Sequence, residues 1–119
     1  MKKIILTSSI VAVLFVACKS KKETVSTAPA LNCANKALAY NTDIKSIIES
    51  SCTRCHNTNE KAGYNFFTIE SVKKAALNGE LLGTIKHQAG FPKMPKMADK
   101  LDQASIDKIE CWINNGMKE

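Results

Sequence analysis

The longest hydrophobic stretch of the chain lies at its N-terminus. Lys2 and Lys3 precede an apolar run at residues 4–16, which only three hydroxyl side chains interrupt. The run is shorter than the roughly 20 apolar residues of a membrane-spanning helix, and its charged start and apolar middle are typical of an export signal. We therefore predict that residues 1–17 are a signal peptide. No second apolar stretch is as long, which excludes a protein with several membrane spans.

The apolar run ends in Phe15-Val16-Ala17-Cys18, which resembles the lipobox of bacterial lipoproteins. The resemblance implies that Cys18 is acylated and begins an exported protein that is tethered to a bacterial membrane and faces the periplasm. The alternative is an ordinary signal peptide cut near an incidental cysteine. Residues 19–30 are polar and small, a composition that does not fold by itself. Residues 18–38 are thus predicted to be the lipidated cysteine and a flexible linker.

Apolar residues recur at helical spacing in residues 39–119, and strand-like alternation never exceeds about five positions. We expect an all-α domain of four short helices. The first is predicted to begin with Thr42 as N-cap and to run toward Cys52. The second is predicted over Ile69–Asn78, with Thr68 as N-cap. Its candidates for the buried face are Val72, Ala75, Ala76 and Leu77.

The third and fourth predicted helices enclose a loop. The third is expected over Glu80–His87, and the fourth is expected to begin at Asp102 as N-cap and to end at Gly116. Residues 89–100 contain two prolines and a glycine, so they are predicted to be loop. The apolar stripe of the fourth helix consists of Ile106, Ile109, Trp112 and Ile113.

Size and charge narrow the class of protein. The predicted domain has fewer than about 90 residues, a size at which a chain buries a small share of its surface and often depends on a cofactor, a metal or a disulfide. The chain has 17 Lys and Arg against 11 Asp and Glu, a net charge of +6. An exported chain without aromatic residues beside a basic stripe is not expected to bind nucleic acid.

The segment Cys52-Thr53-Arg54-Cys55-His56 is the strongest chemical signal in the sequence. Two cysteines separated by two residues, with His directly after the second, form the attachment pattern of c-type haem. One helical turn places both thiols on one side, where each can form a thioether with a haem vinyl group. His56 then lies close enough to be the proximal iron ligand. We predict one covalent haem c.

Two other uses of these cysteines compete with haem attachment. A structural zinc site would use Cys52, Cys55, His56 and His87, but adjacent Cys and His residues rarely bind one tetrahedral ion and no second close pair is present. A thioredoxin-like redox pair would follow a strand, whereas an amphipathic helix is predicted before Cys52. Haem attachment is the prediction that the pattern favours.

The haem iron would need a second axial ligand, and four residues are candidates: His87, Met94, Met97 and Met117. Met117 follows the helix stop, and a His at a helix end is more often a capping or haem-edge residue. Met94 and Met97 lie in a loop whose prolines restrict the backbone and present a flexible thioether at a set depth. The residues alone leave Met94 and Met97 open.

Several segments together resemble the small monohaem cytochrome c domain of bacterial exported proteins. They are Tyr40-Asn41-Thr42-Asp43-Ile44, Cys52 to His56, Met94-Pro95, Leu101, Ile109, Trp112-Ile113 and Gly116. The resemblance implies a small cytochrome c fold over residues 39–119, with the first and last helices in contact. It also implies that Met94, in the Met-Pro step, is the distal iron ligand, with Met97 as second choice.

Five cysteines can be divided among three roles. Lipid takes Cys18 and haem takes two, which leaves Cys33 and Cys111. Export makes a disulfide between them a reasonable expectation, and the resemblance places the first and last helices in contact. The alternative is two free thiols, with Cys111 as a small core residue.

Histidine and methionine ligation would leave no open iron position, so we expect a one-electron carrier and not an enzyme. Lysines at 86, 93, 96 and 100 surround the predicted ligand loop and would favour an acidic redox protein as partner, or would simply solvate the loop. Two other functions stay open. A labile Met94 would allow a haem-based gas sensor or a peroxidase-like protein, and the third reading is the structural zinc module.

Overall fold

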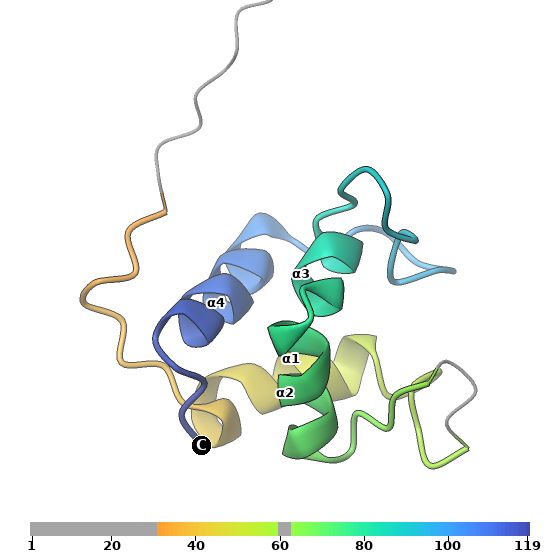
Figure 1. The fold of residues 1–119 in the computed structure, drawn as a ribbon, viewed down its shortest axis with the longest axis horizontal. Coiled ribbons are helices and arrows are strands. Elements are labelled where there is room, and N and C mark those ends of the chain that lie inside the picture. The colour runs from red at the N-terminus through yellow and green to blue at the C-terminus, as the bar shows by residue number, and fades with distance from the viewer. Residues whose placement is uncertain (1–30, 60–62) are drawn as a thin grey trace, which may run out of the picture.

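The computed structural model describes residues 31–59 and 63–119, and these residues form helices joined by turns and loops, without a strand (Figure 1). The prediction of an all-helical domain is confirmed for this part of the chain. The predicted signal peptide, residues 1–17, and Cys18 lie outside the described residues. Among the described residues, none of the helices has the length and apolar character needed to cross a membrane.

The first helical unit begins earlier than predicted. A π-helical segment, η1 (Tyr40–Ile44), continues directly into α1 (Lys45–Ser51). The prediction that Thr42 is the N-cap is wrong, since Ala39 holds that position. Asp43 Oδ2 accepts a hydrogen bond from the Ala39 backbone N–H at 3.0 Å, and the Thr42 hydroxyl donates to the same oxygen at 2.6 Å. The carboxylate therefore reaches back to satisfy the start of the helix, and the hydroxyl supports it.

Helices α2 (Ile69–Leu77) and α3 (Glu80–Ile85) follow each other across a tight turn at Gly79. The Thr68 hydroxyl accepts from the Ser71 N–H at 3.4 Å, which confirms Thr68 as the N-cap of α2. Leu77 is 74 % exposed, so its expected burial is wrong. Leu77 is the last residue of α2, directly before the turn into α3, and its side chain has no facing helix to pack against.

Helix α3 ends at Ile85, two residues before the predicted end, because His87 has a φ of +58° that no α-helix continues. Helix α4 (Gln103–Asn114) has Asp102 as N-cap, as predicted, and Asp102 Oδ1 accepts from the Ser105 N–H at 2.9 Å. Gly116, with a φ of +89°, ends this helical segment as predicted. Residues 89–100 form the predicted loop.

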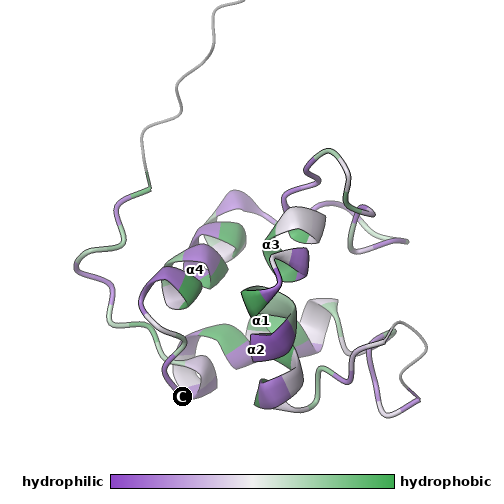
Figure 2. Ribbon diagram, in the orientation of Figure 1, coloured by the Kyte–Doolittle hydropathy of each residue, from purple (hydrophilic) through white to green (hydrophobic). Residues whose placement is uncertain are grey.

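One apolar core joins all the helices. Helix α4 packs against η1 and α3, and α2 packs against α3, so the first and last helical units are in contact. The Tyr40 and Trp112 rings meet at the centre of this contact, with centroids 5.7 Å apart. Figure 2 shows apolar residues along the inner sides of the helices and polar residues on their outer sides. The largest fully buried side chains are Trp112, Ile44, Ile48, Ile106, Ile109, Val72 and Cys111.

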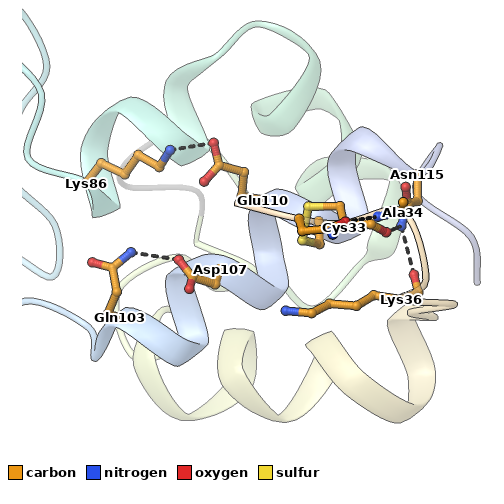
Figure 3. The surroundings of a disulfide bond; sticks show 10 residues. Cys33, Ala34, Lys36, Lys86, Gln103, Asp107, Glu110 and Asn115 are labelled. Atoms are coloured by element: carbon orange, nitrogen blue, oxygen red, sulfur yellow. Dashed lines mark hydrogen bonds and ion pairs between the residues drawn. A yellow bond between two sulfur atoms is a disulfide. The ribbon is translucent and has the colours of Figure 1, made fainter. Parts of the chain in front are cut away.

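A disulfide fastens the segment before η1 to the last helix. Cys33 and Cys111 are bonded, with Cα atoms 5.1 Å apart (Figure 3). Asn115 adds two hydrogen bonds, because its Nδ2 donates to the carbonyls of Cys33 at 3.1 Å and Lys36 at 2.7 Å. The two cysteines are 78 residues apart in the sequence, so the disulfide closes a loop that includes most of the domain. It therefore limits the conformational freedom of the unfolded chain and stabilises the fold.

Candidate functional site

A cavity of about 540 Å³ opens between the end of α1, helix α3 and the loop at residues 90–97. This volume lies within the roughly 300–1,000 Å³ of small-molecule and cofactor sites. Its wall is largely apolar and includes Phe66, Leu81, Ile85, Phe91 and Leu101. The wall also includes four residues that the sequence singled out for haem binding, namely Cys52, Cys55, His56 and Met94.

The Cys-X-X-Cys-His segment continues the last turn of α1. The Cys52 N–H donates to the Ile48 carbonyl at 2.9 Å, and the Cys52 carbonyl accepts from the N–H groups of Cys55 and His56. These bonds wind residues 52–56 into a compact turn that brings Cys52, Cys55 and His56 to one cavity. Cys52 is half-buried and Cys55 is exposed, and neither forms a disulfide. Burial raises the pKa of the Cys52 thiol to about 11, so this thiol is protonated at neutral pH.

His56 is held by Phe66. The two rings stack with centroids 4.7 Å apart and planes inclined by 23°, and the Phe66 N–H donates to the His56 carbonyl at 2.9 Å. Desolvation lowers the pKa of His56, which favours the neutral imidazole that a metal ion requires. Its Nδ1 is buried without a hydrogen-bond partner in the described residues. A buried ring nitrogen without a partner is costly, and a bound group that engages the ring would remove that cost.

The stack continues outward through Tyr64, a residue that the sequence analysis did not assign. The Tyr64 and Phe66 rings are 5.5 Å apart and inclined by 25°. The Tyr64 hydroxyl donates to Glu80 Oε2 and accepts from Asn78 Nδ2, the latter at 2.7 Å. The hydrogen bond to Glu80 raises the pKa of Tyr64. The stack thus links His56 to the turn between α2 and α3.

The two methionines of the loop differ in their surroundings. Met94 is half-buried, and its N–H donates to the Thr84 carbonyl at 3.2 Å. Met97 also borders the cavity, but it is 90 % exposed. A thioether that is partly buried and has a fixed backbone has less freedom to lose on binding a metal. Of the two methionines, Met94 is therefore the better-placed candidate for a metal ligand.

His87 does not line the cavity, although it is close to it in the chain. Its Nε2 lies 3.0 Å from the Met94 carbonyl oxygen. The zinc alternative would need His87 beside Cys52, Cys55 and His56. In residues 31–59 and 63–119, no three His, Cys, Asp or Glu side chains come together as a metal-binding group.

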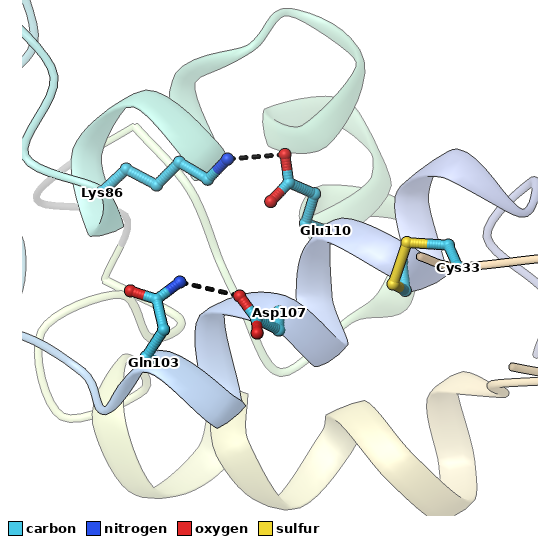
Figure 4. A network of polar contacts seen from close by, with 6 residues as sticks. Cys33, Lys86, Gln103, Asp107 and Glu110 are labelled. Atoms are coloured by element: carbon cyan, nitrogen blue, oxygen red, sulfur yellow. Dashed lines mark hydrogen bonds and ion pairs between the residues drawn. A yellow bond between two sulfur atoms is a disulfide. The ribbon is translucent and has the colours of Figure 1, made fainter. Parts of the chain in front are cut away.

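The lysines around the loop are not equivalent. Lys86 forms an ion pair with Glu110 of α4 at 2.5 Å, and both side chains are half-buried (Figure 4). Lys86 therefore joins α3 to α4 and is not a free surface charge. Lys93, Lys96 and Lys100 are exposed, and Lys96 borders the cavity. Three positive charges thus remain around the loop that carries Met94.

Two residues shape the cavity wall without a sequence signal that assigns them. Phe66 is 5 % exposed and supports His56, and Phe91 lies directly over Gly83 of α3. Both contacts join residues that are distant in the sequence or separated by a loop.

Comparisons of the chain with protein-family models, with curated proteins and with solved structures found no match.

Proposed function

We propose that this chain is an exported, lipid-anchored monohaem c-type cytochrome that carries one electron at a time. The observation that carries the proposal is the position of the Cys52-to-His56 turn in the wall of an apolar cavity that Met94 also lines. The attachment pattern, a neutral imidazole, a thioether and a cavity of cofactor size are the features that this function needs.

Each residue has a definite task in this proposal. Cys52 and Cys55 hold the haem covalently through their sulfur atoms, so the small domain keeps it in both oxidation states. His56 supplies a ring nitrogen from one segment and Met94 supplies a sulfur from another. Bound haem would supply the one-electron chemistry of its iron, which alternates between the ferrous and ferric states. Phe66, Leu81 and Ile85 keep water away from the buried side of the cavity.

The first experiment tests attachment. We expect the full chain, produced in a bacterium that attaches haem to exported proteins, to retain haem after denaturation and to show the absorption spectrum of a c-type cytochrome. Cys52→Ala with Cys55→Ala should remove the covalent haem, and Cys33→Ala with Cys111→Ala, the matched control, should keep it. A wild-type chain without covalent haem would contradict the proposal.

The second experiment tests the distal ligand and the absence of an open iron position. Met94→Ala should abolish the weak sulfur-to-iron absorption band of the oxidised protein and allow carbon monoxide to bind the reduced protein. Met97→Ala should change neither property, because Met97 is an exposed residue at the cavity margin. Tight carbon monoxide binding by the wild type would instead support a gas sensor or a peroxidase-like protein.

The proposed partner is a redox protein with an acidic surface, and lipid attached to Cys18 would anchor the chain to the membrane. Lys93, Lys96 and Lys100 are exposed around the ligand loop and would accelerate association with such a partner at low salt. Replacing the three lysines by Gln should lower the association rate and weaken its dependence on salt.

Cys18→Ser should release the protein from the membrane fraction, and an unchanged distribution would refute lipid anchoring.

A further inference from the structure

The loop that carries Met94 has few attachments to the rest of the domain. At its start, the Phe91 N–H donates to the carbonyl of Gln88 in the turn after α3, and at Met94 the N–H and the carbonyl contact Thr84 and His87. Among the described residues, no hydrogen bond is made to residues 95–101. The position of Met94 therefore depends on its own two bonds and on packing.

His87 reaches the Met94 carbonyl because of its unusual backbone. Its φ of +58° is in the left-handed region, which is unfavourable for a residue with a side chain. The chain turns there at the end of α3, and the imidazole Nε2 comes within 3.0 Å of the Met94 oxygen. Since a carbonyl oxygen only accepts hydrogen bonds, Nε2 carries the proton and donates.

Packing supports the same loop at its other end. A methyl group built on Gly83 would lie 2.5 Å from Cγ of the Phe91 ring, so the ring lies on the bare backbone of α3. The Phe91 N–H also donates to the Gln88 carbonyl at 3.2 Å. Phe91 fixes where the loop starts, whereas His87 acts directly on the peptide group of Met94.

We infer that His87 is a positioning residue, whose hydrogen bond to the Met94 carbonyl holds the Met94 thioether at the cavity. The inference rests on the proposed function, in which Met94 is the distal ligand. His87 itself does not line the cavity, so its effect passes through the backbone of Met94.

The test compares His87→Gln with His87→Leu. Both replacements have a β-carbon and a similar cost at a positive φ, but only Gln keeps an N–H donor at the end of its side chain. In the Leu variant we expect the Met94 amide to exchange its hydrogen roughly tenfold faster than in the wild type, because one of two local bonds is lost. The Gln variant should stay within a few-fold of the wild type, and amides of α4 should be unchanged in both.

The haem-loaded protein supplies a second readout. His87→Leu should weaken the sulfur-to-iron band and admit carbon monoxide, and His87→Gln should restore the wild-type behaviour. A merely structural role would change thermal stability and leave the band intact. If Leu leaves both the exchange of the Met94 amide and the band as in the wild type, the inference is overturned.

Failure of the inference is distinguishable from failure of the proposed function. A wild-type chain that attaches no haem refutes the function, and the exchange of the Met94 amide in that chain still decides whether His87 holds the loop. If the Leu variant does not fold, His87→Gly serves in its place, because it lacks the donor and also removes the backbone strain. Exchange of the Met94 amide at the wild-type rate in the Gly variant would then overturn the inference.

Discussion

The two sides of this small domain are stabilised in different ways. On one side, α4 is cross-linked to the N-terminal segment by the disulfide, and Asn115 adds two hydrogen bonds beside it. The Lys118 carbonyl accepts from both the Tyr40 N–H and Trp112 Nε1, each at 2.8 Å. We call this the clasp side. Its core is closed by the protein's own side chains.

The cavity side consists of residues 52–56, α3 and the loop at residues 89–100, and side chains do not fill its interior. It contains about 540 Å³ of open volume, a half-buried thiol and a buried ring nitrogen that has no hydrogen-bond partner among residues 31–59 and 63–119. A packed interior normally leaves few voids larger than a water molecule. The difference indicates that the clasp side contributes more of the domain's stability, while the cavity side leaves the space that the proposed haem would need.

The largest expected effect belongs to the centre of the clasp side. Trp112 is fully buried and packs on Tyr40, so Trp112→Ala should cost about 3–5 kcal/mol of unfolding free energy. Chemical denaturation measures the loss. Phe67→Ala is the control, since Phe67 is 59 % exposed, and its change should stay within about 0.5 kcal/mol. Equal losses in the two variants would contradict the role of Trp112 as the centre of the clasp-side core.

Loss of the disulfide should be nearly as severe. For Cys33→Ala with Cys111→Ala we expect a loss of about 2–5 kcal/mol, because the cross-link restricts the unfolded chain over a long loop. Reduction of the wild type should lower stability by a comparable amount and should not affect the double variant. A wild type that is insensitive to reductant would show that the hydrogen bonds of Asn115 and Lys118 suffice to hold the clasp.

The sequence predicted the helical segments and named four residues that the structure brings to one cavity, but it did not predict the contacts that support these residues. Thr68, Asp102 and Gly116 act as predicted because caps and stops depend on neighbouring residues alone. The Thr42 prediction failed because Thr and Asp are adjacent there, and the carboxylate reaches the helix start at Ala39. The Cys-X-X-Cys-His segment is local as well, so its arrangement in one turn followed from its spacing.

The supports depend on contacts that no local pattern contains. The stacking of Phe66 on His56 and the packing of Phe91 on Gly83 arise where segments separated in the sequence meet in the cavity wall. His87 could be recognised only as a residue at a helix end, because its contact with Met94 requires a positive φ that the sequence does not indicate. Leu77 fits the apolar period of α2 but lies where no neighbour covers it.

An intermediate loss of stability is expected at the contact between Phe91 and Gly83 on the cavity side. Gly83→Ala should displace Phe91 and destabilise the protein by about 1–2 kcal/mol, since overpacking outweighs the better helix propensity of Ala. Phe91→Ala in the same chain should make Gly83→Ala neutral or stabilising. A double-mutant cycle of denaturation free energies measures this coupling, and additive effects would show that the ring moves aside without cost.

The smallest effect concerns pH and compares the carboxylates at the starts of the first and last helical units, Asp43 and Asp102. Hydrogen bonds from Ser105 lower the pKa of Asp102, and hydrogen bonds from Thr42 and Ala39 lower that of Asp43. A lowered pKa in the folded state means that the unfolded chain binds the proton more readily. The contribution of each carboxylate to the free energy of unfolding is therefore complete above the unfolded pKa of about 3.9, and it is lost as the pH falls through the folded pKa.

Asp102→Asn and Asp43→Asn remove the charge and keep a side-chain acceptor, so each should make the loss of stability in acid less steep. Helical circular dichroism and Trp112 fluorescence together give the measurement, because the first reports on all helices and the second on the clasp side. If the domain unfolds as one unit, both signals should shift equally in either variant. A shift of circular dichroism without one of fluorescence in Asp102→Asn would mean that the α4 start and the loop before it unfold separately, while the disulfide keeps the clasp side folded.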